Sequence, residues 1–294
     1  MTVHTLLKEG HQVVATMRNA DSKNKAAAEE IKAAGAHVVE LDVTDDASVK
    51  AGVGEAITLL DGLDVVVNNA GIGVLGIQEQ FDIEDFKKLF EVNVFGVQRV
   101  NRAVLPHLRK QGSGLLIHIS SLLGRIAFPF YGPYNASKWA LEAIAENYRV
   151  ELSAMASNAH LEAIAENYRV ELSGFGVDSC IVEPGGFPTS FFNSLMQPSD
   201  TSQNESYGDM VHAPKHAFES FEGALASNPA QDPQNVADAI ASLITTPAGQ
   251  RPARTVVDKM GMGDHIDPYN QQLAQIHEGL YGAFGMGDML NLKL

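Results

Sequence analysis

The sequence contains very little cysteine and no pattern that would hold a metal. Cys180 is the only cysteine in 294 residues, and it lies in an apolar stretch. A small core side chain is therefore a better interpretation of Cys180 than a nucleophile or a ligand. The ten histidines show no metal-ligand spacing with carboxylates, so we predict no metal site.

Long apolar runs and positive charge are also scarce. No apolar run reaches the roughly 18 residues of a membrane-spanning helix, and Met1-Thr2-Val3-His4 does not begin a signal peptide. The 21 Lys and Arg residues face 36 Asp and Glu residues, which gives a net charge of −15. This charge argues against nucleic acid or an anionic membrane as a partner. We expect a cytoplasmic protein that acts on a small molecule.

Strand and helix patterns alternate along the chain. The length of 294 residues and the 45% apolar content fit one large domain over residues 1–294. The expected strands are residues 12–17, 37–41, 61–67, 115–121, 177–182 and 254–257. The expected helices are residues 3–9, 25–33, 83–108, 134–153, 233–244 and 268–281, the last packing through Leu273, Ile276 and Leu280. This alternation predicts an α/β fold, a doubly wound parallel sheet with helices on both faces.

Tyr134, Lys138 and Ser121 carry the chemistry that this pattern suggests. Tyr134 and Lys138 lie four residues apart and share one face of the predicted helix. An ammonium beside a phenol stabilises the phenolate, which lowers a pKa near ~10 toward neutrality. Such a tyrosine can exchange a proton with an alcohol or carbonyl oxygen, and Ser121 at the end of a strand is placed to hold that oxygen. Taken alone, the Tyr-x-x-x-Lys spacing also fits an ordinary helix surface.

Further motifs, in the same order along the chain, make the sequence resemble the short-chain dehydrogenase/reductase family over about residues 3–260. They are Asn68-Asn69-Ala70-Gly71, Asn93 within Glu91-Val92-Asn93-Val94-Phe95-Gly96, and Pro184-Gly185 with Thr189. The resemblance implies a Rossmann-like sheet and hydride transfer between a nicotinamide cofactor and an alcohol/carbonyl pair.

The resemblance also implies a role for each matching residue. Tyr134 would be the general acid/base, Lys138 would lower its pKa and hold the ribose, Ser121 would orient the substrate oxygen, and Asn93 would anchor a proton relay. The remaining matches imply cofactor contacts by Asn69, Ala70, Gly71, Pro184, Gly185 and Thr189. Of these, Pro184, Gly185 and Thr189 would lie near the nicotinamide end of the cofactor.

Arg18 bears on the choice of cofactor. In folds of this type an acidic residue after the second strand binds the ribose 2′-OH of NAD, whereas an arginine accommodates a 2′-phosphate. Thr16-Met17-Arg18-Asn19 has no carboxylate there, so we predict NADP over NAD. A surface arginine with no such role is the alternative. We expect Asp42 to bind near the adenine.

The sequence departs from the family pattern at its beginning. It has neither the first strand nor the glycine-rich turn G-x-x-x-G-x-G that would precede the helix at residues 3–9. The turn would bring backbone N–H groups to the cofactor pyrophosphate, and the strand would lie between residues 12–17 and 61–67. We expect the chain to lack about 20 residues of this pattern. A relic of the family that no longer binds cofactor is therefore a competing hypothesis.

The second departure is an internal repeat. Residues 141–153 recur identically at residues 161–173. An α-helix turns about 100° per residue, so a shift of 20 residues rotates the second copy by about 200°, and only one copy can fill the same groove. We expect the first copy to pack and residues 154–173 to form an excursion, because Gly174 and Gly176 can absorb the detour.

The substrate is predicted only as a class. The expected lid at residues 190–230 and the loop Phe128–Tyr131 are rich in apolar side chains and contain no cluster of Lys and Arg. We expect a moderately apolar alcohol, ketone or aldehyde, such as a steroid, retinoid or lipid.

The resemblance implies a homodimer or homotetramer through helices 83–108 and 134–153, if the repeat permits. An epimerase or dehydratase is an alternative, since related sugar-nucleotide enzymes use Tyr-x-x-x-Lys, but Asn93 and Asn-Asn-Ala-Gly favour a dehydrogenase.

Overall fold

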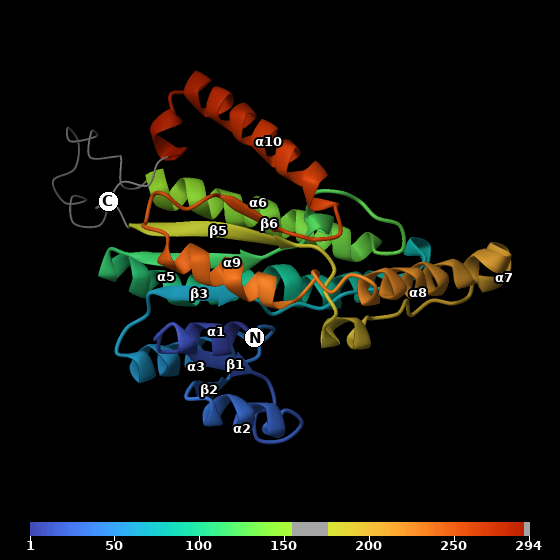
Figure 1. The fold of residues 1–294 in the computed structure, drawn as a ribbon, viewed down its shortest axis with the longest axis horizontal. Helices are drawn as coiled ribbons and strands as arrows, with labels where there is room; N and C mark the ends of the chain where they lie inside the picture. The colour runs from blue at the N-terminus through green and yellow to red at the C-terminus, as the bar shows by residue number, and fades with distance from the viewer. Residues whose placement is uncertain (155–175, 291–294) are drawn as a thin grey trace.

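The computed structural model describes residues 1–154 and 176–290, and in these residues six parallel strands are covered by helices (Figure 1). The strands form a two-stranded sheet and a four-stranded sheet, with orders β1-β2 and β3-β4-β5-β6. Their bounds are β1 Val14–Met17, β2 His37–Glu40, β3 Val65–Asn68, β4 Gly114–Ile119, β5 Val177–Pro184 and β6 Arg254–Val257. The predicted α/β class with a parallel sheet is confirmed.

The α-helices precede, connect and follow these strands along the chain, and most of them were expected from the sequence. Their bounds are α1 Thr2–Lys8, α2 Lys25–Ala33, α3 Asp46–Leu60, α4 Ile83–Phe90, α5 Gly96–Gln111, α6 Gly132–Ala154, α7 Asn204–Tyr207, α8 Ala213–Ala226, α9 Gln234–Thr245 and α10 Gly263–Ala283. The sequence analysis did not single out α3, although Asp45 caps it by accepting a hydrogen bond from the Ser48 N–H at 2.6 Å. No helix of the described residues is long and apolar enough to cross a membrane.

Apolar side chains cover both faces of the four-stranded sheet. On one face Leu116 of β4 packs with side chains of α3, α5 and α6, and on the other Leu115 and Ile117 pack with α9. This division follows from the alternation of side chains along a strand. Cys180 is fully buried in the second cluster, and burial raises the pKa of its thiol to about 12, as a core role requires.

A large cavity separates the two sheets. No strand pairing joins β1 to β3 in the described part of the chain, and a cavity of about 760 Å³ lies between them. Figure 1 shows β1 and β2 together below β3. The cavity lies between the strands where the sequence analysis placed the missing one.

The first copy of the repeat forms the second half of α6. Leu141, Ala145 and Leu152 are buried, and Tyr148 packs against the core cluster beneath them. The Arg149 guanidinium donates to Asp178 Oδ1 at 3.1 Å and to the Ser179 carbonyl at 3.0 Å, which ties the helix to β5. The second copy, residues 161–173, lies outside the described residues, and so does the expected excursion.

The predicted packing face of the last helix is wrong for two of its three residues, since only Leu273 is half-buried. Ile276 and Leu280 of α10 are 56% and 49% exposed. The helix packs instead through a stripe that includes Ile266, which is buried, and Asn270 and His277, which bind polar groups below. Hydrophobic periodicity missed this face because its polar residues pair with buried charges.

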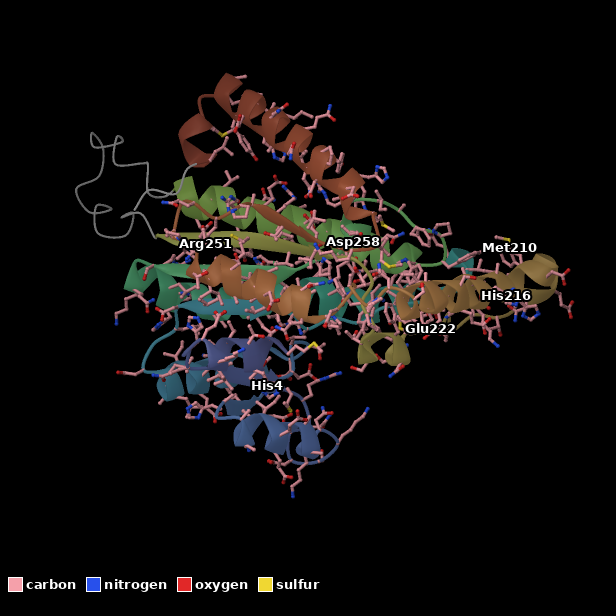
Figure 2. All side chains as sticks on the ribbon, in the orientation of Figure 1. His4, Met210, His216, Glu222, Arg251 and Asp258 are labelled. Atoms are coloured by element: carbon pink, nitrogen blue, oxygen red, sulfur yellow. The ribbon has the colours of Figure 1, made fainter. Side chains whose placement is uncertain are left out.

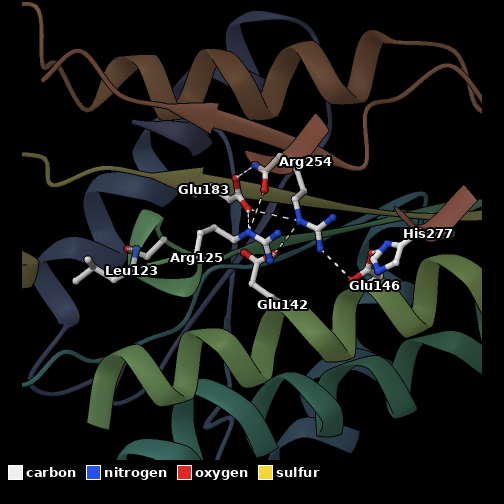
Figure 3. Close-up of polar contacts among 9 residues, drawn as sticks. Leu123, Arg125, Glu142, Glu146, Glu183, Arg254 and His277 are labelled. Atoms are coloured by element: carbon white, nitrogen blue, oxygen red, sulfur yellow. Dashed lines mark hydrogen bonds and ion pairs between the residues drawn. The ribbon is translucent and has the colours of Figure 1, made fainter. Parts of the chain in front are cut away.

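Those charges form a network that we call the buried ion cluster: Arg125, Glu142, Glu146, Glu183, Arg254 and His277 (Figure 3). Arg254 Nε lies 3.1 Å from Glu142 Oε2 and 3.5 Å from Glu183 Oε1, and its Nη2 lies 3.1 Å from Glu146. Arg125 Nε lies 3.5 Å from Glu183. The pairing of two arginines with these carboxylates offsets the cost of removing the charges from water.

Candidate active site

Three parallel strands bring the predicted site residues to one edge. β3 ends at Asn68, β4 at Ile119 and β5 at Pro184, and the carboxyl ends of parallel strands meet on one side of a sheet. α6 crosses this edge with Tyr134 and Lys138 on its first turns. The four residues predicted to be catalytic therefore come from three segments: the stretch between α4 and α5, the turn after β4, and the first turns of α6.

Asn93 lies in a short π-helix, Glu91–Phe95, between α4 and α5, and is 1% exposed. Its side chain accepts from the Ile72 N–H and donates to the Ile72 carbonyl, both at 2.9 Å. It also donates to Ser137 Oγ at 3.0 Å, and Ser137 Oγ donates to the Tyr134 carbonyl at 2.8 Å. The π-helix thus aims Asn93 at the loop after β3 and at α6, as π-bulges often do at functional sites.

Ser121, Tyr134 and Lys138 lie together. Ser121 lies close enough to the Tyr134 phenol to lower its pKa, and Lys138 Nζ lies 5.6 Å from the centre of the Tyr134 ring. Lys138 Nζ donates to the Ile119 carbonyl at 2.8 Å, which fixes the ammonium at the end of β4. The structure therefore gathers the predicted catalytic residues, with Asn93 joined to the group through Ser137.

The expected lowering of the Tyr134 pKa is not found in this structure. Burial raises the pKa of Tyr134 to about 12, against a smaller lowering by the hydrogen bond with Ser121. Burial also lowers the pKa of Lys138 to about 8, although Glu142 of the buried ion cluster acts in the opposite direction. Both groups are pushed toward their neutral forms because no water solvates their charges.

A group of aromatic side chains packs against the Tyr134 ring. Phe191 lies 5.9 Å from the Tyr134 ring, and Phe192 continues the contact to Phe218 and Phe221 of α8, at 5.6 Å each. We call Phe191, Phe192, Phe218 and Phe221 the aromatic lid cluster. Its signal in the sequence is the pair of adjacent phenylalanines just after Thr189.

Backbone pairing holds the base of the lid against the sheet edge. The Met196 N–H donates to the Gly73 carbonyl at 2.9 Å, and the Leu75 N–H donates to the Met196 carbonyl at 3.0 Å. A Cβ on Gly73 would lie 2.6 Å from the Phe191 ring, so only glycine permits this approach. Met210 and His216 lie at the far end of the lid region, beyond Glu222, whereas Asp258 lies over the sheet (Figure 2).

A second cavity, of about 230 Å³, lies beside the predicted catalytic residues. Its lining includes three predicted cofactor residues, Arg18, Ala70 and Gly71. Asp42 is close by, because Arg18 Nη1 lies 3.5 Å from Asp42 Oδ2. Hydrogen bonds from Thr44 and the charge of Arg18 lower the pKa of Asp42 despite the opposing effect of burial. Asn69 lines the larger cavity next to it.

Gly71 leaves open the space between Asn93 and Lys138, two of the predicted catalytic residues. A Cβ at Gly71 would lie 3.5 Å from Asn93 Oδ1 and 3.8 Å from Lys138 Nζ. The missing side chain therefore leaves room for a ligand against both groups.

The predicted cofactor residues at the end of β5 and just after it, Pro184, Gly185 and Thr189, have different surroundings. The Gly185 N–H donates to the Val257 carbonyl at 2.9 Å, and a Cβ on Gly185 would lie 2.3 Å from Asp258 Oδ1. Close packing against β6 and its following turn thus requires glycine there. Pro184 ends β5, and Thr189 Oγ1 accepts from the Phe191 N–H at 3.4 Å at the start of the lid. Pro184 and Thr189 therefore frame the segment that leads from the sheet to Phe191.

The parallel sheet, with a Tyr-Lys pair, a serine and an asparagine at its carboxyl edge, defines an α/β protein of the dehydrogenase type. Residues 1–156 match the short chain dehydrogenase family. The chain belongs to this family.

Two curated relatives extend the match beyond residue 156. An uncharacterized oxidoreductase, YusZ of Bacillus subtilis, is 33% identical over 243 residues, which cover 79% of this chain and 76% of the relative. A 3-ketodihydrosphingosine reductase of Bacteroides thetaiotaomicron is 34% identical over 209 residues, which cover 71% and 67%.

Solved structures agree with this assignment. A short-chain dehydrogenase from Streptomyces avermitilis superposes with a TM-score of 0.69 at 26% identity, covering 96% of this chain and 92% of the other. Further matching structures of the same fold hold NADP or NAD.

Proposed function

We propose that the chain is a nicotinamide-dependent oxidoreductase that interconverts an alcohol and a carbonyl group on an apolar substrate, with Tyr134 as general acid/base. The observation that carries the proposal is the joint placement of Asn93, Ser121, Tyr134 and Lys138 at one sheet edge. A buried phenol with a raised pKa is a proton donor at neutral pH, which suits carbonyl reduction.

The side chains of the site would have different roles in the proton transfer to the substrate oxygen. The Ser121 and Tyr134 hydroxyls lie close together, so a carbonyl oxygen placed between them could accept from both O–H groups. As the Tyr134 proton leaves, the Lys138 ammonium at 5.6 Å stabilises the phenolate that forms. Asn93 holds the loop after β3 against α6 through Ile72 and Ser137 and positions the helix that carries the pair.

The cofactor proposal rests on the small cavity and its neighbours. When bound, the nicotinamide group supplies or accepts the hydride. Arg18 and Asp42 fit the adenosine end, since Arg18 is exposed and could reach a 2′-phosphate, so we propose NADP over NAD. Lys138, with Pro184, Gly185 and Thr189, would face the other end. Among the described residues no glycine-rich turn follows β1 or β2 to cradle the pyrophosphate.

The apolar substrate follows from the aromatic lid cluster. Phe191 packs on the Tyr134 ring, and no Lys or Arg lies within the cluster that could neutralise a phosphate or carboxylate. The name of the Bacteroides relative, 3-ketodihydrosphingosine reductase, supports the same class. A lipid-like ketone or aldehyde is therefore our proposed substrate.

Turnover with NADPH and a long-chain ketone tests the proposal, with Tyr134→Phe as the inactive variant. Phenylalanine keeps the ring contact with Phe191 and removes only the hydroxyl group, so loss of turnover with unchanged stability would support the role. A long-chain ketone reduced equally well by Tyr134→Phe would refute it. Arg18→Asp should shift the preference from NADP toward NAD, and an unchanged preference would refute the NADP assignment.

A relic that binds no cofactor is the second candidate, favoured by the 760 Å³ cavity that divides the sheet. Titration of the chain with NADPH, followed by nucleotide fluorescence, separates the two. Saturable binding supports the oxidoreductase, and no binding up to millimolar nucleotide supports the relic.

A further inference from the structure

Gln231 is a buried polar side chain outside the group of predicted catalytic residues. It lies in the loop between α8 and α9 and is 1% exposed. A glutamine is rarely buried to this extent unless its amide is hydrogen-bonded. The sequence analysis gave Gln231 no role, because a single glutamine in a polar loop forms no pattern.

The amide of Gln231 connects three segments of the chain. Its Nε2 donates to the Gly186 carbonyl at 2.7 Å and to Asp258 Oδ1 at 3.2 Å. Its Oε1 accepts from the Lys259 N–H at 2.5 Å. Both amide hydrogens and the oxygen therefore have partners. These partners lie after β5 and after β6, whereas Gln231 itself follows α8.

The three partners fix the orientation of this amide. A flipped amide would place its oxygen against the Gly186 carbonyl and the Asp258 carboxylate, and its NH2 group against the Lys259 N–H. All three hydrogen bonds would then be replaced by contacts between like groups. The site therefore selects one orientation of a side chain that supplies two donors and one acceptor.

Further hydrogen bonds brace the segments that Gln231 joins. Asp258 Oδ2 accepts from the Gly263 N–H at 3.0 Å, at the start of α10. Asn228 Nδ2, just beyond α8, donates to the Lys259 carbonyl at 2.8 Å. The turn after β6 is thus held to the end of α8 and to the start of α10, and Gln231 adds the loop after β5 to the same unit.

The aromatic lid cluster contacts the same glycine. A Cβ on Gly186 would lie 2.1 Å from Phe221 Cζ, so the ring occupies the place that a side chain would take. The Phe221 ring lies 5.6 Å from that of Phe192, which lies 5.7 Å from that of Phe191. Phe191 in turn lies 5.9 Å from the Tyr134 ring. The position of Gly186 therefore affects where the lid meets the predicted catalytic tyrosine.

We propose that Gln231 is a positioning residue of the active site, whose amide holds the loop of residues 184–187 against the turn after β6. Held in this way, the loop presents Pro184 and Gly185 to the cofactor and supports the lid over Tyr134. The effect on turnover rests on the proposed nicotinamide-dependent function, whereas the holding of the loop does not. Gln231 would act on the reaction only through this loop.

Removal of the amide would leave three buried groups without their partner. The Gly186 carbonyl, Asp258 Oδ1 and the Lys259 N–H would each lose a hydrogen bond. Loss of two or three such bonds should shift the loop toward displaced positions by roughly tenfold or more. Cofactor binding must then return the loop to its place, so the apparent affinity falls with the fraction of chains that hold it there.

The experiment compares the parent chain with Gln231→Met and with a matched control, Gln234→Met. Methionine has nearly the length of glutamine and lacks the amide. The Gln234 amide donates to Thr5 Oγ1 at 2.7 Å and to Asp238 Oδ1 at 2.8 Å, so the control removes hydrogen bonds at a different place. Hydrogen exchange followed by mass spectrometry is measured on peptides that span residues 184–192 and 256–263. Both peptides should exchange roughly tenfold faster in Gln231→Met and at the parent rate in Gln234→Met.

Steady-state turnover separates a positioning role from a purely structural one. With NADPH and a long-chain ketone, Gln231→Met should raise the cofactor KM roughly tenfold and change kcat by less than about threefold. The reason is that bound cofactor holds the loop in place again before the chemical step. A residue that served stability alone would lower the Tm and leave KM unchanged.

A second variant, Phe221→Ala, removes the ring over Gly186 and keeps the Gln231 amide. It should speed exchange in α8, while the peptide of residues 184–192 keeps the protection that it has in the parent. This variant also decides the proposal where Gln231→Met does not fold, as judged by circular dichroism. Loss of protection at residues 184–192 in Phe221→Ala would show that the ring, and not Gln231, holds the loop.

Parent-like exchange of residues 184–192 in Gln231→Met would overturn the proposal. Faster exchange with an unchanged cofactor KM would refute the connection between Gln231 and the cofactor. A parent chain that shows no turnover with NADPH would count against the proposed function. The exchange measurements need neither cofactor nor turnover, so they would still decide whether Gln231 holds the loop.

Discussion

The two identical copies of the repeat allow a matched test of which one fills the core. Leu141 is 1% exposed in α6, and Leu161 occupies the same position of the second copy, outside the described residues. Leu141→Ala removes buried methyl groups and leaves a cavity, which costs about 2–5 kcal/mol of unfolding free energy. Leu161→Ala should stay within about 0.5 kcal/mol, because Leu141 already holds the core position.

Thermal and urea unfolding of the two variants measure this difference directly. A loss of 2–5 kcal/mol corresponds to a fall in Tm of roughly 5–15 °C for a chain of this size. Because both copies have the same sequence from residue 141 to 153 and from 161 to 173, local helix propensity cancels between the variants. Equal losses, or a larger loss for Leu161→Ala, would refute the packing of the first copy.

Three further predictions concern the candidate active site. Lys138→Met should raise the free energy of unfolding by up to about 3 kcal/mol at pH 7, measured by urea unfolding. The reason is that the pKa of Lys138 is about 8 in the folded chain, below its ordinary value, so burial of the charged ammonium destabilises the parent at pH 7. The parent chain should therefore gain stability as pH rises from about 8 to 10.5, and the variant should not. A parent and variant with equal pH dependence would contradict this. Phe191→Ala should admit water to Tyr134 and lower its pKa from about 12 by roughly one to two units, seen as a shift of the alkaline limb of turnover against pH. An unshifted limb would show that Phe191 does not shield the phenol. Gly71→Ala should leave Tm unchanged, since its Cβ would make ordinary contacts at 3.5 and 3.8 Å, but raise the cofactor KM about tenfold or more. An unaltered KM would place the cofactor elsewhere.

The strands and the main helices could be predicted because hydrophobic periodicity reports burial. The strand predicted at residues 254–257 and the helix at 25–33 match β6 and α2 in their bounds. The face of α10 could not be predicted in this way, because Asn270 and His277 face inward to meet Glu183 and Glu146. Periodicity counts such polar positions as exposed.

The candidate site was also predictable only in part, because the sequence shows residue types and their spacing but not what surrounds each side chain. Residue types and spacing were enough to predict one group made of Asn93, Ser121, Tyr134 and Lys138. The structure brings these residues to one edge of the sheet. The direction of the Tyr134 pKa was wrong, because the sequence does not show that Phe191 covers the phenol. The π-helix that orients Asn93 also left no local signal, since its residues read as one helix with α4 and α5.

The division of the sheet has a consequence for native-state hydrogen exchange. No ladder of the described residues passes from β1 and β2 to β3, and the two parts contact each other through helices, α1 with α9 and α3 with α5. Amide protons of β1 and β2 should therefore exchange through a partial opening that leaves β4 and β5 protected. One common exchange free energy for β1, β2, β4 and β5 would show instead that the two sheets open as a single cooperative unit.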